Sequence, residues 1–396
     1  MTPSITAVRM TGDSRRVDLP LLVLGPSLGT SAATLWSTCA AGLTDRFDVL
    51  AWDLPGHGHN RGVPDEPFTM AELARGVLAV VDDVLAQRDE VGGTFAYAGD
   101  SVGGAVGLQL LLDAPARVSA AVLLCTGARI GESAAWEERT RQVAASGTSA
   151  LVAGSAERWF APGFLDREPA AGSALFHALS DALDEGYVQV CSALAGFDVR
   201  GRLGEVVAPV LAVAGAEDQV TPAAGLAEIA DGVAHGRLVV LDDVAHLAPV
   251  ESPAEVAALI RQHVLGEAVP LSGSERYTAG LAVRREVLGD AHVDRALAAT
   301  TDLTRDFQEL ITEYAWGSIW TRPGLDRRSR SLITLTALVA RGHHEELAMH
   351  LRAARTNGLT VAEIKECLLQ TAIYCGVPDA NTAFRIAQQV LDEENP

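Results

Sequence analysis

The chain has 396 residues, 48% of them hydrophobic, and carries a net charge of −20 at pH 7. This length predicts two domains rather than one, and the acidic balance argues against nucleic acids and anionic membranes as partners. No segment approaches the ~18 consecutive apolar residues of a membrane span. Residues 1–20 lack the apolar core of a secretory signal, so a cytoplasmic protein is expected.

Short strand-like segments alternate with helix-like segments along residues 1–265. Strands are expected at 21–24, 47–52, 94–98, 118–124, 209–214 and 237–241. Because strands separated by helices usually pair in parallel, the pattern predicts a mostly parallel sheet covered by helices. The strands stop between 128 and 201, where helix-like sequence rich in Trp, Phe and Arg predicts an inserted helical lid.

A Gly-x-Ser-x-Gly pattern at 99–103 follows one of these strands and is typical of a nucleophile elbow. Asp218 and His246 each follow a later strand, so the order Ser, Asp, His is the one that α/β-hydrolases use. Each residue has an ordinary alternative: a turn serine, a helix-capping aspartate or a surface histidine. Together they predict that Ser101 is the nucleophile, that His246 takes its proton, and that Asp218 orients the imidazole.

The oxyanion formed in such a reaction needs backbone N–H donors. Val102 is expected to supply one donor, and Leu28 in the loop 25–30 the other, although that loop could also be a simple tight turn. A serine at the elbow excludes the members of this fold that use an aspartate nucleophile. Esterases, lactonases, thioesterases, C–C hydrolases and cofactor-free haloperoxidases all remain open.

A short linker with Gly and Pro at 266–274 precedes a second region, 275–396, that contains only helix-like patterns. Helices are expected at 326–340 and 345–356, each followed by a glycine. A Thr-x-x-Glu capping box at 360–363 begins another helix. The second domain is therefore expected to be all-α.

Positive charge is concentrated in this second domain. Residues 322–355 contain seven arginines against three acidic residues, a net charge of about +4 in a strongly acidic chain. Such a cluster suits an anionic substrate, whereas a solvated helix face or subunit contacts would also explain it. Arg328, Arg352 and Arg355 are the candidate substrate-binding residues.

One helix face of the same domain carries His343, Glu346 and His350, at the spacing i, i+3, i+7. A metal site, an acid–base cluster and an exposed polar stripe are the alternatives, and no metal is expected because a fourth ligand is not evident. His350 is the candidate proton donor, since an imidazole can be protonated near neutral pH. Glu346 would orient His350, or replace it as the acid if burial raises the pKa of Glu346.

Further motifs in the first domain point to a known family. They are SLGT at 27–30, ARIG at 128–131 with Trp136, and RWF at 158–160. Through these motifs residues 1–265 resemble 3-oxoadipate enol-lactone hydrolases, which implies an α/β-hydrolase fold and makes Arg129 and Trp136 candidate contacts for an anionic lactone. The oxyanion loop departs from the fold's usual pattern, because Pro26 stands where His or Asn is common.

The second domain carries motifs of another family. They are LGDAHV at 288–293, YAWGSIW at 314–320, RPGLD at 322–326, HLRAAR at 350–355 and YCGVP at 374–378. Through them residues 275–396 resemble 4-carboxymuconolactone decarboxylases. The Cys-x-x-Cys of the related alkylhydroperoxidase proteins is missing, so thiol peroxidase chemistry is not expected. Domains of the resembled family associate into rings, which implies a homo-oligomer formed through the helical domain.

The two resemblances together imply a bifunctional, cofactor-free enzyme of the protocatechuate branch of aromatic catabolism. Its second domain would decarboxylate 4-carboxymuconolactone, and its first domain would open the resulting enol-lactone, so the expected partners are small anionic lactones. One alternative is a hydrolase whose helical domain only mediates oligomerisation. Another is a general esterase or a cofactor-free haloperoxidase.

Overall fold

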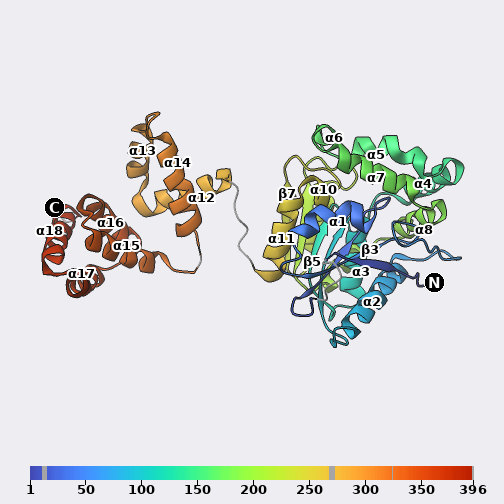
Figure 1. Ribbon diagram of the computed structural model, residues 1–396, viewed down its shortest axis with the longest axis horizontal. Helices are drawn as coiled ribbons and strands as arrows, with labels where there is room; N and C mark the ends of the chain where they lie inside the picture. The colour runs from blue at the N-terminus through green and yellow to red at the C-terminus, as the bar shows by residue number, and fades with distance from the viewer. Residues whose placement is uncertain (11–15, 267–272, 323, 395–396) are drawn as a thin grey trace. The chain divides into compact units, whose positions relative to one another are not determined.

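The computed structural model describes residues 1–10, 16–266, 273–322 and 324–394. The chain forms two compact units, Met1–Val269 and Pro270–Pro396 (Figure 1). Most of the expected linker, residues 267–272, lies outside the described residues, as does Pro323 of the RPGLD motif.

The first unit is built on a seven-stranded sheet with the strand order β1-β3-β2-β4-β5-β6-β7. The strands are β1 (Thr6–Arg9), β2 (Leu21–Gly25), β3 (Asp48–Asp53), β4 (Phe95–Asp100), β5 (Val118–Leu124), β6 (Val210–Gly215) and β7 (Gly236–Leu241). β1 pairs antiparallel with β3, and the other five pairings of the sheet are parallel. The sequence did not predict β1, because this half-buried edge strand has no continuous apolar run.

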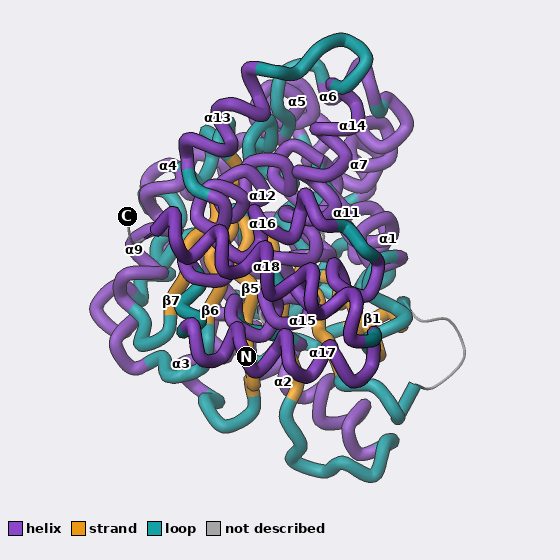
Figure 2. Tube along the Cα trace, turned by 90° about the vertical axis from the view of Figure 1, so that its left-hand side faces the viewer, coloured by secondary structure: helices purple, strands orange, loops and turns teal. Residues whose placement is uncertain are grey.

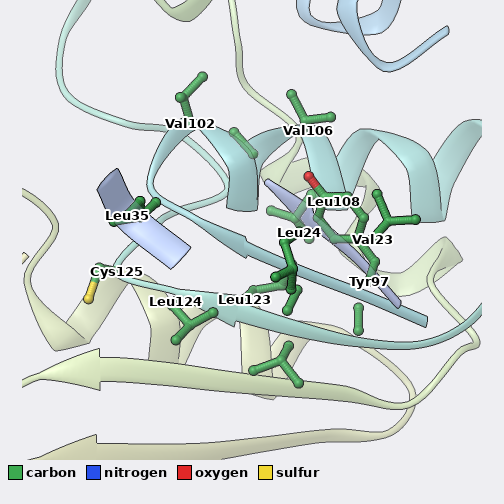
Figure 3. Close-up of a cluster of buried hydrophobic side chains, with 14 of the residues drawn as sticks. Val23, Leu24, Leu35, Tyr97, Val102, Val106, Leu108, Leu123, Leu124 and Cys125 are labelled. Carbon is green, nitrogen blue, oxygen red and sulfur yellow. The ribbon is translucent and has the colours of Figure 1, made fainter. Parts of the chain in front are cut away.

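Helices cover this sheet. Those outside the lid are α1 (Ala32–Ala41), α2 (Met70–Ala86), α3 (Val102–Asp113), α9 (Ala223–Gly232), α10 (Ala248–Glu251) and α11 (Pro253–Leu265). α1 packs against α10 and α11, while α2 packs against α3. Figure 2 shows the strands in orange among the helices in purple. Side chains of β4, β5 and α3, including Tyr97, Leu123 and Val106, meet in the core (Figure 3).

The segment between β5 and β6 is helical, as expected for a lid, and gathers along one side of the first unit (Figure 1). It comprises α4 (Ser133–Ser146), η1 (Thr148–Leu151), α5 (Val152–Trp159), α6 (Phe164–Arg167), α7 (Pro169–Asp181), α8 (Asp184–Ala195) and η2 (Arg200–Glu205). Aromatic rings hold it together: Phe160 stacks on Phe164 at a centroid distance of 5.0 Å, and Trp159 stacks on Phe176 at 6.3 Å.

The second unit is helical throughout its described residues. Its elements are α12 (Gly273–Leu288), α13 (Asp290–Ala298), α14 (Arg305–Leu310), the π-helix η3 (Ile311–Trp320), α15 (Arg327–Arg341), α16 (His344–Thr356), α17 (Val361–Cys375) and α18 (Val377–Glu394). The expected capping box opens α17, where the Thr360 side chain accepts from the Glu363 N–H. Gly342, at φ +67°, ends α15 in the left-handed conformation that glycine tolerates. None of the described helices is both long and apolar enough to cross a membrane.

Candidate active sites

The first candidate site lies at the corner between β4 and α3. Ser101 occupies this corner with φ +53° and ψ −116°, a strained conformation for a residue other than glycine. A Cβ atom on Gly103 would lie 2.5 Å from the carbonyl carbon of Gly25, and one on Gly99 would lie 2.4 Å from the backbone of Gly103. The two glycines are therefore required, because α3 passes so close to the neighbouring strand and loop.

Three polar side chains from separate elements meet at this corner. The Ser101 hydroxyl lies 3.0 Å from His246 Nε2, and His246 Nδ1 lies 3.0 Å from Asp218 Oδ2. All three residues are buried. The Thr221 hydroxyl donates to Asp218 at 2.7 Å, and burial, which alone would raise the pKa of Asp218, is outweighed by His246 and Thr221, so this pKa is lowered. The carboxylate is thus held in the charged form that can stabilise an imidazolium.

Glu251, which the sequence analysis did not single out, holds the loop that carries His246. Its two carboxylate oxygens accept from the backbone N–H of Ala245 at 2.9 Å and from that of Ala161 at 2.7 Å. The backbone N–H of His246 donates to the carbonyl oxygen of Trp159 at 3.1 Å. These contacts join the histidine loop to the lid, and no sequence pattern links segments so far apart in the chain.

The two expected oxyanion donors lie on neighbouring segments, at the start of α3 and in the loop that precedes α1. Val102 is the first residue of α3, so its N–H has no partner within the helix. The Gly103 N–H donates to the Pro26 carbonyl oxygen at 2.9 Å, which fixes the loop that carries Leu28 beside the start of α3. Leu28 lines a cavity together with Ser101.

That cavity has a volume of about 210 Å³ and opens onto both Ser101 and His246. The expected contact residue Trp136 lines it, and the Trp136 indole N–H donates to the Ile130 carbonyl oxygen. Arg129 does not line it. Its guanidinium instead pairs with Glu132, three residues along the chain, so the structure gives no support to Arg129 as a substrate contact.

Two other arginines of the lid line the cavity in its place, Arg139 of α4 and Arg158 of α5. Arg139 donates to the Tyr187 hydroxyl at 3.4 Å, and Arg158 Nε donates to the Gly154 carbonyl oxygen at 2.8 Å. Neither arginine forms an ion pair with any carboxylate in the described part of the chain. Burial and then the positive charge of Arg139 lower the pKa of Arg158. Two positive charges without an ion-pair partner among the described residues thus lie beside the nucleophile, although the charge of Glu157 also acts on Arg158.

A second fully buried carboxyl group, Asp100, directly precedes the nucleophile. Burial, followed by the negative charges of Asp218 and Glu251, raises the pKa of Asp100 well above its usual value. The neutral, protonated form of Asp100 is therefore favoured in the folded protein. In the Gly-x-Ser-x-Gly pattern this position is the variable residue, so the sequence pattern does not indicate a role for Asp100.

In the second unit, the residues of the expected histidine face differ in their surroundings. His343 precedes α16 as its N-cap residue and is exposed, as is Glu346. His350 is half-buried, and this burial lowers the pKa of His350; Glu346 opposes the shift and the positive charge of His292 adds to it. The surroundings therefore disfavour the imidazolium form of His350 in the free protein.

The three arginines expected to bind substrate are engaged by the protein itself. Arg328 pairs with Glu363 and with the Gly358 carbonyl oxygen, and Arg352 pairs with Glu393. Arg355 donates to the Leu359 carbonyl oxygen at 2.6 Å. The ion pairs of Arg328 and Arg352 join neighbouring helices, whereas the contact of Arg355 fixes the loop that follows its own helix. The described residues contain no group of three His, Cys, Asp or Glu side chains arranged to hold a metal ion.

Comparison with known proteins shows which families the two units resemble. The alpha/beta hydrolase family matches residues 22–259, and the carboxymuconolactone decarboxylase family matches residues 305–389. A 4-carboxymuconolactone decarboxylase of Acinetobacter baylyi is 46% identical over 123 residues, 31% of this chain and 92% of the relative. The 3-oxoadipate enol-lactonase 2 of the same species is 33% identical over 238 residues, 60% of this chain and 86% of the relative.

Among solved structures, the enol-lactonase from Burkholderia xenovorans LB400 is similar to the first unit. Its TM-score is 0.61 at 28% sequence identity, and the match covers 66% of this chain and 96% of that protein. The fold of the first unit and its sequence are therefore both similar to those of enol-lactonases.

Proposed function

Because the chain belongs to the alpha/beta hydrolase family through residues 22–259 and to the 4-carboxymuconolactone decarboxylases through its C-terminal unit, we propose that it performs two consecutive reactions. The helical unit converts 4-carboxymuconolactone to 3-oxoadipate enol-lactone and CO2. The hydrolase unit opens that lactone to 3-oxoadipate. One chain thereby makes the intermediate and consumes it.

The arginine pair in the Ser101 cavity is the observation that carries the lactonase proposal. The enol-lactone bears one carboxymethyl group, an anion at pH 7, and Arg139 and Arg158 lack carboxylate partners among the described residues. A general esterase acting on neutral esters has no use for two uncompensated charges, which cost desolvation energy. The pair would hold the carboxymethyl group while the lactone carbonyl lies at Ser101.

In the proposed lactonase reaction, His246 removes the Ser101 proton as the hydroxyl oxygen attacks the lactone carbonyl carbon. The N–H groups of Leu28 and Val102 stabilise the resulting oxyanion. The ring C–O bond then breaks, and the enol oxygen leaves with a proton from His246. The enol becomes the ketone of 3-oxoadipate, and water, activated by His246, hydrolyses the acyl-enzyme.

In the proposed decarboxylation, the substrate is its own electron sink. The departing carboxylate is bonded to the ring carbon that also bears the lactone oxygen, and the ring double bond connects this carbon to the lactone carbonyl. When CO2 leaves, the bonding electrons move onto the carbonyl oxygen and form a dienolate. The protein must stabilise that oxygen and protonate the α-carbon, and this chemistry requires no metal or cofactor.

Incubation of the protein with 4-carboxymuconolactone, with CO2 and 3-oxoadipate both followed, tests the proposal. Release of both products in equal amounts is expected. Lactone opening without CO2 release would instead favour the alternative in which the helical unit is not catalytic. Aryl ester turnover as fast as enol-lactone turnover would favour a general esterase.

We further propose self-association through the helical unit and a cytoplasmic location. Several large apolar side chains of the helical unit are exposed, including Ile333, Leu369, Ile373 and Tyr374, and a second copy of the chain would cover them. Light scattering at micromolar concentration is expected to give a mass that is a multiple of 41.5 kDa. A strict monomer would contradict the proposal of self-association.

A further inference from the structure

Arg284 of α12 is a deeply buried cation whose side chain has no carboxylate partner among the described residues. The residue is 4% exposed. Its Nη1 donates to the neutral oxygens of Gln308 and Thr312, both at 3.1 Å, and its Nε–H is buried without a hydrogen-bond partner. Arginine is rarely buried without a carboxylate, because an uncompensated charge in a protein interior costs several kcal/mol.

The surroundings of Arg284 are rigid. α12 packs on the π-helix η3 so closely that a Cβ atom on Gly280 would lie 2.1 Å from the Thr312 carbonyl oxygen, and one on Gly317 would lie 2.1 Å from that of Arg276. A π-helix is rare and is often found at functional sites. The close packing of α12 on η3 thus fixes the helix that carries Arg284, and the hydrogen bonds to Gln308 and Thr312 orient its guanidinium.

Two histidines lie on helices that pack against α12: His292 on α13 and His350 on α16. Burial lowers the pKa of His292, and the positive charge of Arg284 lowers it further. The acidic group that acts on these histidines is Glu346, near His350, whereas Arg284 has no carboxylate partner among the described residues. Arg284 can therefore still pair with an anion. One small apolar cluster also joins these elements, formed by Val287, Trp316 and Ala353.

We propose that Arg284 stabilises the enolate oxygen formed during decarboxylation, and that His292 or His350 delivers the proton to the α-carbon. This inference rests on the proposed decarboxylase function and names the site for it. The carbonyl carbon that carries the enolate oxygen is bonded directly to the α-carbon. The group that holds the oxygen must therefore lie beside the group that supplies the proton, and both histidines lie on helices that pack against α12, the helix of Arg284.

The decarboxylation step moves one electron pair within the substrate and one proton from the protein. The C–C bond to the departing carboxylate breaks, CO2 leaves, and its bonding electrons reach the carbonyl oxygen opposite Arg284. The dienolate then takes one proton at the α-carbon from an imidazolium. Solvent returns a proton to the neutral imidazole that remains. Binding of an anionic substrate offsets the positive charge of Arg284 and so favours the imidazolium form of the neighbouring histidine.

The substitution Arg284→Met in the full-length protein tests this inference. We expect the kcat of CO2 release to fall about 10²-fold to 10³-fold, the range for loss of an oxyanion donor, with a smaller change in KM. The melting temperature of the helical unit is expected to stay the same or rise, because a buried unpaired charge is removed. A merely structural arginine would show the opposite: a lower melting temperature and a nearly normal kcat in the folded protein.

The chain offers matched controls. Arg305→Met removes an exposed arginine that pairs with Asp302 and should leave CO2 release unchanged. Lactone opening at Ser101, measured on the same samples, reports whether the first unit is intact, and Arg284→Lys, which keeps the charge, should recover part of kcat. A kcat of Arg284→Met within threefold of wild type would overturn the inference. Failure of the wild-type protein to release CO2 would refute the decarboxylase function itself.

Discussion

Replacing the arginines of the Ser101 cavity by methionine separates recognition of the substrate's carboxylate from ester chemistry. Methionine keeps much of the arginine volume and removes the charge. A hydrogen bond to a charged group contributes about 1.5–3 kcal/mol, and about 1.4 kcal/mol corresponds to a factor of ten. Arg158→Met and Arg139→Met are each expected to lower kcat/KM for the enol-lactone by about 10-fold to 150-fold, mainly through KM.

The assay compares the enol-lactone with a neutral aryl ester, because loss of a carboxylate contact should leave the neutral substrate nearly unaffected. Arg141→Met is the matched control in α4, since Arg141 is exposed and pairs with Glu138. Arg129→Met, which removes the arginine expected from the sequence, should also have little effect. Equal losses on both substrates would refute the assignment, because they would mean that the cavity arginines only support the lid.

Further predictions concern the groups around the nucleophile. Ser101→Ala should abolish lactone opening and leave CO2 release intact, so that the enol-lactone accumulates in a chromatographic assay; near-normal opening would refute the role of Ser101. Glu251→Gln should lower the lactonase kcat about tenfold with KM nearly constant, since an amide oxygen can accept from only one of the two N–H groups that position His246; an unchanged kcat would contradict this. Asp100→Asn should keep kcat/KM at pH 7 within a few-fold, because burial favours the neutral form of this acid and an amide is also neutral. Its raised pKa means that the folded state retains a proton that the unfolded chain releases above about pH 4. Asp100→Asn should therefore raise the free energy of unfolding at pH 7 but not below pH 4, as measured by urea denaturation.

The sequence by itself was sufficient to predict the features that depend on residues close together along the chain. The close approach of α3 to a neighbouring loop demands glycine at positions 99 and 103, so a local pattern marked the nucleophile elbow. Buried parallel strands are continuous apolar runs, and the capping box at Thr360 uses residues three apart. Each of these signals lies within one short segment, which is why chain order alone brought Ser101, Asp218 and His246 into one hypothesis.

Only the tertiary structure decided which charged side chains are free to meet a substrate. Arg328 belongs to a charged cluster in the sequence, yet the fold places Glu363 of another helix beside it, whereas Arg129 pairs with a carboxylate only three residues along the chain. Arg158 belongs to a family motif, and Arg139 and Arg284 have no signal in the sequence. Only the folded molecule shows that these three arginines lack a carboxylate partner among the described residues. An ion pair forms between side chains close in space, whatever their separation in the chain, so the pairing of a charge is a property of the folded molecule.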